Sequence, residues 1–152
     1  MSLDEGSSRE KRIYHIMYSA IYAFDVDDTL AIQGAPFPGP VILNDILALR
    51  QQGIPTGICG NFLVLFKVYP DWWKLFSWFG PAELTGTSLI AHHQYKHYDL
   101  IRIAKSLKAN RYVMVGNRQG DSKVRPGSQD DLQARLAKWE FISEQDFANG
   151  RR

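Results

Sequence analysis

The sequence predicts an α/β domain in which a parallel sheet carries helices on both faces. Short runs of β-branched and aromatic residues alternate along the chain with stretches whose apolar residues recur at helical spacing. This alternation is typical of strand–helix–strand units, which build parallel sheets. Several of the strand-like runs end in polar loops, which is where open parallel sheets bind their ligands. We therefore expect a three-layer, doubly wound parallel sheet.

Composition narrows the class of protein. A chain of 152 residues with 45% hydrophobic residues suits one globular domain with a single core. The net charge of +2 is too small to indicate nucleic-acid binding by itself. The single cysteine excludes an internal disulfide framework, and no apolar run is long enough to span a membrane. We expect residues 1–12 to be a flexible tail, in part left over from expression, and residues 13–150 to form one cytoplasmic domain.

The first half of the domain contains two expected strands and one helix. Residues 13–26 are apolar, and their second half is the first strand. Residues 31–40 are dense in glycine and proline and must form a loop. Apolar residues then recur at helical spacing from Ile42 up to Gly53, a suitable C-terminal cap. Residues 54–59 have the composition of a short buried strand.

The segment 62–79 is rich in aromatic residues. Pro70 is expected to divide it into two helices, with Asp71 capping the second. Two interpretations stay open. The aromatic side chains can pack as core helices against the sheet. Alternatively, because Trp72 and Trp73 are adjacent and point in different directions, part of the segment can form a homo-oligomer or partner interface.

The second half continues the alternation. Residues 83–90 are expected to form a strand and a loop, and Asp99 is expected to cap an amphipathic helix. Residues 112–116 form the next predicted strand. The segment 128–131 matches a capping box before a further helix, and residues 139–142 are expected to form the last strand.

The most informative stretch is the end of the first strand, where Asp25, Asp27 and Asp28 follow an apolar run within four positions. Like charges this close oppose each other's ionisation unless a cation shares them. Mg²⁺, which prefers oxygen ligands and water, is a natural partner. The alternative is an acidic turn after a strand, with no bound ion.

An apolar strand followed by Asp-x-Asp-x-Thr resembles the first motif of the haloacid dehalogenase superfamily, most of whose members are phosphohydrolases. The resemblance implies that Asp25 attacks phosphorus and that Asp27 is the general acid and base. Thr29 matches the threonine of the motif, and Asp28 stands where glycine is commoner.

The second and third motifs of that family match in part. The family has a serine or threonine that holds the phosphoryl group after the second strand, where this chain has Cys59. A thiol is a weak donor, so the backbone amides of Gly60 and Asn61 are expected to contribute. The alternative for Cys59 is a small buried hydrophobic residue with no role in the site. The lysine of the third motif corresponds to Lys96, just ahead of a helix. We expect its ammonium about 3 to 4 Å from the Asp25 carboxylate, within reach of an ion pair.

The fourth motif reads Gly116-Asn117 followed by Asp121, so an amide replaces the first acid. The resemblance implies a magnesium ion held by Asp25, Asp27, Asn117 and Asp121. The amide oxygen of Asn117 has no formal charge and is expected to bind the ion weakly.

A competing metal site would use His92, His93 and His97, the last two of which are four residues apart. No cysteine or glutamate completes that set, so exposed histidines are the simpler interpretation.

The sequence thus favours a magnesium-dependent phosphatase with no sizeable cap domain, which acts through an aspartyl-phosphate on an unknown phosphorylated small molecule or macromolecule. A phosphotransferase with the same chemistry stays open. The rival hypothesis is a catalytically weakened domain that acts as an interaction module, which the departures at Cys59 and Asn117 favour.

Overall fold

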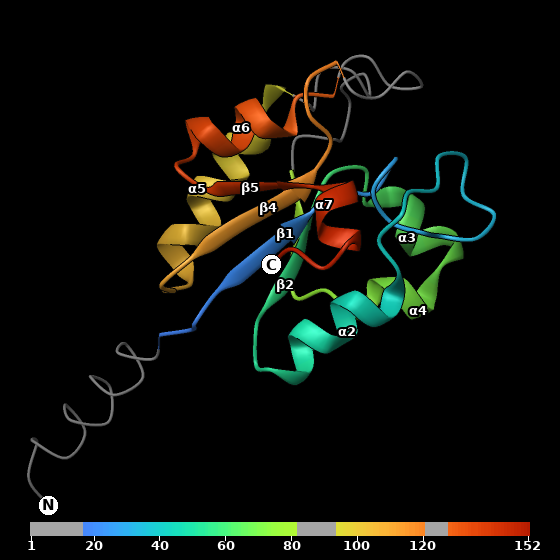
Figure 1. The fold of residues 1–152 in the computed structure, drawn as a ribbon, viewed down its shortest axis with the longest axis horizontal. Coiled ribbons are helices and arrows are strands. Elements are labelled where there is room, and N and C mark those ends of the chain that lie inside the picture. The colour runs from blue at the N-terminus through green and yellow to red at the C-terminus, as the bar shows by residue number, and fades with distance from the viewer. Residues whose placement is uncertain (1–16, 82–93, 121–127) are drawn as a thin grey trace, which may run out of the picture.

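The computed structural model describes residues 17–81, 94–120 and 128–152 (Figure 1). Its strands are β1 (Ile21–Phe24), β2 (Thr56–Cys59), β3 (Phe79–Gly80), β4 (Tyr112–Gly116) and β5 (Glu140–Ser143). Its helices are α2 (Leu43–Gln51), α3 (Leu63–Val68), α4 (Pro70–Trp73), α5 (Lys96–Ser106), α6 (Asp130–Leu136) and α7 (Glu144–Ala148). The strands pair in parallel in the order β3-β2-β1-β4-β5. The predicted α/β fold with a parallel sheet is confirmed.

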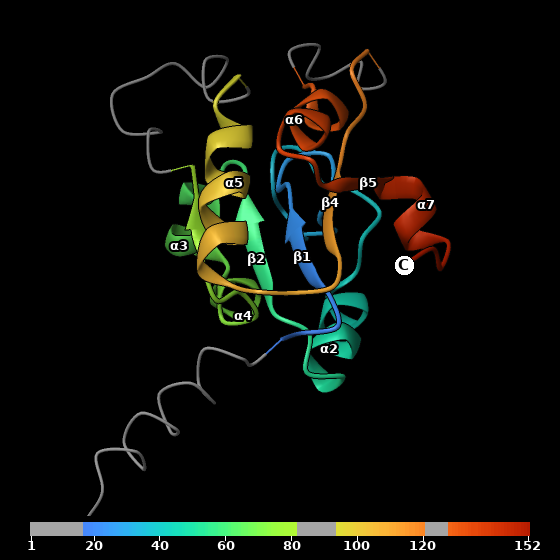
Figure 2. The ribbon, with the colours of Figure 1, turned by 90° about the vertical axis from the view of Figure 1, so that its left-hand side faces the viewer.

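Helices lie on both faces of the sheet, as the side view in Figure 2 shows. On one face, Tyr22 and Phe24 of β1 enter a large apolar cluster that includes side chains of α2, α3, α4 and α7. On the other face, Ile21 and Ala23 enter a smaller cluster with side chains of α5 and α6. Successive strand residues point to opposite faces, so one apolar strand supplies both clusters. The molecule therefore has three layers.

The order of the strands reverses beside β1. From β1 the chain passes through α2 to β2 and through α3 and α4 to β3. The strands β4 and β5 lie on the other side of β1 and are covered by α6 on the opposite face, where α5 packs against β2. In open parallel sheets, ligands bind beyond the carboxyl ends of the strands at such a reversal point. Asp25 and Asn117 directly follow the two strands that flank it.

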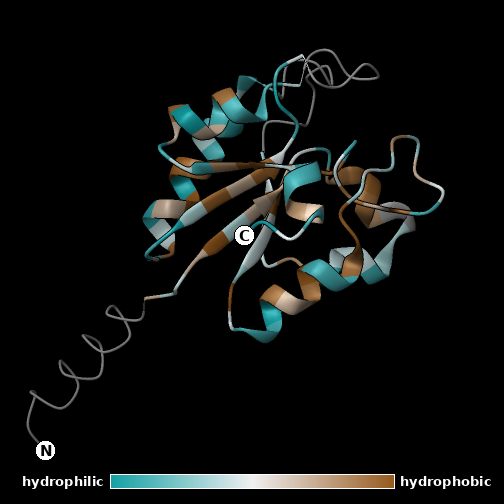
Figure 3. Ribbon diagram, viewed as in Figure 1, coloured by the Kyte–Doolittle hydropathy of each residue, from teal (hydrophilic) through white to brown (hydrophobic). Residues whose placement is uncertain are grey.

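The central strands are the most hydrophobic layer, and the helices that cover them are amphipathic. In Figure 3 the central strands β1 and β4 carry brown, hydrophobic segments, whereas the helices alternate between brown and teal. Helix α2 ends where the sequence predicts, because Gly53 adopts a φ of 78° that favours glycine after a helix. In the part of the chain that the structure describes, no helix combines the length and hydropathy needed to cross a membrane.

The aromatic segment 62–79 is divided at Pro70, as predicted, and most of it packs in the core. Trp72 and Phe76 are 8% and 6% exposed. Among the side chains of α3 that the structure describes, those of Leu63 and Phe66 are 44% and 49% exposed. The core interpretation therefore accounts for most of the segment, while α3 keeps a small exposed apolar surface.

The predicted N-terminal caps are wrong. Asp71 is the second residue of α4, Asp99 is the fourth residue of α5, and the segment 128–131 forms no side-chain cap at the start of α6. Asp99 instead forms an ion pair with Arg102 in the next turn. The first residues of α5 and α6, Lys96 and Asp130, are buried and form an ion pair with each other.

Two short elements were not predicted. Strand β3 has only two residues, too few for a periodic pattern, and it pairs with the end of β2. Helix α7 is capped by Ser143, whose Oγ accepts from the backbone N–H of Asp146 at 3.2 Å. The predicted strand at 83–90 and the tail at 1–12 lie outside the described residues.

Candidate active site

The central strands place three residues in one row at the carboxyl edge of the sheet. The register of β1 with β2 and β4 sets Asp25 level with Cys59 and Gly116. All three positions point to the face covered by α5 and α6, because side chains in one row of a sheet share a face. The backbone N–H of Asp25 donates to the carbonyl of Val115 at 2.9 Å, which continues the sheet up to the carboxylate.

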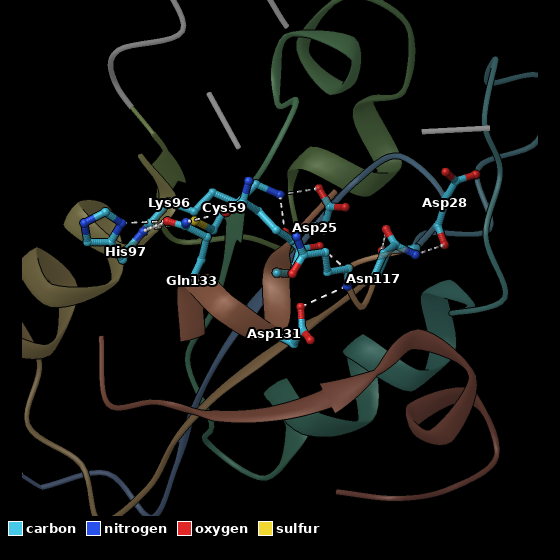
Figure 4. A network of polar contacts seen from close by, with 12 residues as sticks. Asp25, Asp28, Cys59, Lys96, His97, Asn117, Asp131 and Gln133 are labelled. Carbon is cyan, nitrogen blue, oxygen red and sulfur yellow. Dashed lines mark hydrogen bonds and ion pairs between the residues drawn. The ribbon is translucent and has the colours of Figure 1, made fainter. Parts of the chain in front are cut away.

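Lys96 reaches this row from the first position of α5, and its side chain is fully buried. Its Nζ lies 3.0 Å from Oδ1 of Asp25 and 2.6 Å from Oδ1 of Asp130 (Figure 4). The first distance is in the range that the sequence analysis expects. The structure therefore brings Asp25 and Lys96 together, although they are 71 positions apart in the chain.

The charges of this cluster depend on one another. Burial alone would lower the pKa of Lys96, but the carboxylates of Asp130 and Asp25 raise it above its ordinary value. Burial and the negative charge of Asp25 raise the pKa of Asp130, while Lys96 opposes that rise. A cation at the start of a helix is disfavoured by the helix dipole. The two carboxylates offset that cost and keep the ammonium charged at neutral pH.

Asp130 is the site residue that the sequence analysis missed. It is the first residue of α6 and is fully buried, and its Oδ2 accepts the backbone N–H of Asn117 at 2.8 Å. It fits there because Gly116 has no side chain: a Cβ at that position would lie 2.3 Å from Oδ2 of Asp130. The only signal in the sequence was an acid at the start of a helix, which is also the signal of an ordinary helix terminus.

Asp27 and Thr29 lie on the loop that follows β1 and are 5% and 0% exposed. Oδ2 of Asp27 accepts from Nδ2 of Asn61 at 3.2 Å. Asn61 follows β2 by two residues, so its side chain joins the loops of two neighbouring strands. The sequence analysis assigned the backbone amide of Asn61 to phosphate. In this structure its side chain binds Asp27, the proposed general acid.

Cys59 and Gly60 lie at the predicted place but use their polar groups differently. The sulfur of Cys59 is fully buried in the apolar cluster beneath α5, where it lies 3.7 Å from the carbonyl of Lys96. Burial raises the pKa of this thiol well above its ordinary value, so it stays neutral. The N–H of Gly60 donates to the carbonyl of Gly80 at 2.9 Å. This arrangement does not support the predicted phosphate contacts of Cys59 and of the Gly60 amide.

Gly60 nevertheless matters for the shape of the site. A Cβ built at this position would lie 2.3 Å from Oδ1 of Asp25, the oxygen that faces Lys96. Only a residue without a side chain lets the β2 loop approach the carboxylate this closely.

Asn117 follows β4 and is 3% exposed. Its side chain is turned toward the loop after β1, as Figure 4 shows for Asn117 and Asp28. The other residue predicted for the fourth motif, Asp121, lies outside the described residues.

The competing histidine site receives no support from the part of the chain that the structure describes. The backbone N–H and Nδ1 of His97 both contact Oε1 of Gln133, at 2.9 and 2.6 Å. Because that oxygen accepts only, Nδ1 carries a proton and is not a metal ligand in this state. His92 and His93 lie outside the described residues, within which no group of three or more acid, histidine or cysteine side chains is arranged to hold a metal.

The donor chemistry near Asp25 still fits a hydrated magnesium ion. Three buried carboxylates, those of Asp25, Asp27 and Asp130, are accompanied by one ammonium, that of Lys96. When two of these acids are ionised, their negative charge exceeds the positive charge of the ammonium, and a divalent cation would favour that state. Magnesium needs only one or two carboxylates when water and phosphate complete its shell. Asp25, the backbone carbonyl of Asp27 and the amide oxygen of Asn117 are the groups that would hold it.

Comparisons with protein-family models, with curated proteins and with solved structures each found no match to this chain. The functional argument therefore depends on the site itself.

Proposed function

We propose that this protein is a magnesium-dependent phosphohydrolase of the haloacid dehalogenase type that acts through an aspartyl-phosphate. The observation that carries the proposal is the ammonium of Lys96, fully buried and 3.0 Å from Oδ1 of Asp25 at the reversal point of the sheet. A buried ion pair is weak as a device for stability, because desolvation cancels much of its attraction. Such a pair at the place where ligands bind is better explained by chemistry.

In the first step, an oxygen of Asp25 forms a bond to phosphorus while the bond from phosphorus to the leaving oxygen breaks. Asp27 gives its proton to that leaving oxygen. In the second step, a water molecule loses a proton to Asp27 and attacks phosphorus, which releases inorganic phosphate and restores the Asp25 carboxylate. Lys96 offsets the negative charge that the phosphoryl group brings next to Asp25. Bound magnesium would add positive charge at a phosphoryl oxygen.

Asn61 and Asp130 support the reacting groups. Asn61 donates to Oδ2 of Asp27, which fixes the direction of the proposed acid. Asp130 also binds Lys96, at 2.6 Å, and so restrains the ammonium when the phosphoryl group arrives. Preorganised charges of this kind cost no rearrangement during the reaction.

The second candidate is an interaction module without turnover. The N–H of Gly60, which already donates to the carbonyl of Gly80, and the buried thiol of Cys59 favour it, because neither group is placed to hold phosphate. The exposed side chains of Leu63 and Phe66 on α3 would then be part of the binding surface. Against this candidate stands the buried charge cluster, which a binding surface on α3 does not use.

The deciding experiment measures hydrolysis of a generic phosphate ester with magnesium and with EDTA, for the wild type and Asp25→Asn. We expect magnesium-dependent turnover that falls on the order of a thousandfold in Asp25→Asn, because a nucleophile has been replaced. Asp71→Asn is the matched control, since Asp71 is exposed on α4. Phosphate trapped on Asp25 in acid-quenched protein would identify the intermediate. Turnover that survives Asp25→Asn excludes the mechanism, and no turnover in the wild type favours the interaction module.

A further inference from the structure

The side chain of Asn117 connects the end of β4 to the loop that carries Asp27. Its Nδ2 donates to the backbone carbonyl of Asp28 at 3.1 Å. The hydroxyl of Thr29 donates to its Oδ1 at 3.4 Å, which is a long contact. The side chain is almost fully buried, so these protein groups take the place of water around the amide.

The orientation of the amide is fixed by its partners. A backbone carbonyl only accepts hydrogen bonds, so the nitrogen of Asn117 and not its oxygen must face Asp28. A carboxylate at position 117 has no N–H and would place an oxygen against that carbonyl. The contact that the amide makes is therefore not available to an aspartate unless a cation lies between the two oxygens.

The contact acts on a strained residue. Asp28 has a φ of 60°, in the left-handed region that residues other than glycine seldom adopt. Its N–H donates to the carbonyl of Phe37 at 2.8 Å, and its own carbonyl receives Asn117. Both backbone polar groups of Asp28 are thus bound, which keeps the loop in this conformation and fixes the neighbouring Asp27.

We propose that Asn117 is a positioning residue that organises the catalytic loop without a metal ion. An acid at position 117 would need a bound cation to connect it to the Asp28 carbonyl, whereas the amide makes this contact directly. The loop is therefore formed before magnesium binds. Magnesium would then bind to a loop that is already ordered. The inference uses the proposed function for the identity of the metal, but the arrangement of the loop can be tested without any turnover.

The test compares thermal unfolding of the wild type, Asn117→Asp and Asn117→Ala in EDTA and in millimolar magnesium. In EDTA we expect both variants to lose about 5 °C or more in Tm, because a buried hydrogen bond is lost and its partner is left unsatisfied. Magnesium should restore most of the loss in Asn117→Asp, where a new carboxylate can bind it, and should raise the Tm of Asn117→Ala no more than that of the wild type. The wild type should gain only the stability that a ligand of the folded state supplies, and less than Asn117→Asp gains. Asn110→Asp, an exposed position, controls for the added charge.

The variant Asp28→Gly gives a second, independent measurement. Glycine adopts a φ of 60° without strain, so the loop needs less support in this background. Asn117→Asp should therefore lower the Tm by less in the Asp28→Gly background than in the wild type. If Asn117→Asp alone does not fold, the double variant with Asp28→Gly is expected to fold and can be measured instead. The inference is overturned if Asn117→Asp in EDTA is as stable as the wild type, if magnesium fails to restore it, or if its cost is the same in both backgrounds. A wild type that gains as much stability from magnesium as Asn117→Asp gains would also overturn it.

Discussion

The two faces of the sheet are built from the same strands but differ in what they bury. On the face covered by α2, α3, α4 and α7, aromatic rings dominate, and Phe24 packs edge-on against Phe147 with ring centroids 5.3 Å apart. On the face covered by α5 and α6, the apolar cluster is smaller. Toward the carboxyl edge, Asp25, Lys96 and Asp130 continue it as a buried row of charges.

The difference begins at two adjacent residues. Phe24 and Asp25 follow each other in the chain, and the pleat of the strand sends one to the aromatic face and the other to the charged row. The stability of the aromatic face is the sum of many apolar contacts that are individually weak. The charged row depends on a few strong ion pairs. Removing one partner leaves another buried charge without compensation. One face thus supports the fold, and the other is suited to chemistry.

The largest expected effect comes from removing the cation of the charged row. Lys96→Met leaves the carboxylates of Asp25 and Asp130 without the ammonium between them, and breaking such a buried pair costs about 3–5 kcal/mol. Phe24→Ala on the aromatic face should cost a similar amount through the cavity it leaves. The free energy of unfolding, measured with urea at pH 7, gives both values.

A second substitution separates the two mechanisms. Asp130→Asn removes one of the charges that Lys96→Met leaves unpaired, so the double variant should be more stable than Lys96→Met alone. The same Asp130→Asn change should not restore any stability to Phe24→Ala. Equal behaviour in the two backgrounds would mean that the row of charges is ordinary core and that the comparison of the faces is mistaken.

A smaller effect is expected from Gly116→Ala. The added Cβ would lie 2.3 Å from Oδ2 and 2.8 Å from Cγ of Asp130, which cannot move without leaving Lys96 or the Asn117 N–H. Overpacking of this kind costs about 1–3 kcal/mol, and turnover should fall with it because Lys96 loses its support. Combining it with Asp130→Gly, which removes the clashing carboxylate together with the Cβ that would lie 2.9 Å from the added Cβ, should make the added cost of Gly116→Ala small. Denaturant unfolding of the four proteins in this cycle checks the coupling.

The same contrast explains which parts of the structure the sequence predicted. The runs at 112–116 and before Asp25 are continuous and apolar, so periodicity locates their strands, and the end of a parallel strand locates the site. The pairing of Asp25 with Lys96 followed from the family resemblance. Asp130 was missed because its role depends on the space above Gly116 and on the start of α6, which only the tertiary structure fixes. Cys59 was assigned to phosphate by the family resemblance, whereas its side chain lies in the apolar cluster beneath α5.

The smallest expected effect concerns Cys59, where the apolar cluster meets the charged row. Its sulfur contacts the carbonyl of Lys96, and burial raises its pKa well above the ordinary value. The folded protein therefore keeps a neutral thiol at a pH where the unfolded chain, with an ordinary value of 9.0, forms a thiolate. A folded-state pKa that is raised contributes stability below the unfolded value, and this contribution is lost as pH rises above it.

The wild type should accordingly lose stability relative to Cys59→Ala above pH 9, by about 1.4 kcal/mol for each pH unit until the folded thiol ionises. Other groups that titrate in this range are common to both proteins and cancel in the difference. Because Cys59 is the single cysteine, alkylation by a thiol reagent reports on it alone. Labelling of the native wild type should be slow, and it should become faster in Lys96→Met, because the loss of the ion pairs loosens the start of α5 above the sulfur. Rapid labelling of the native wild type would show that the sulfur is open to solvent, and then Cys59 again becomes a candidate for contact with the phosphoryl group.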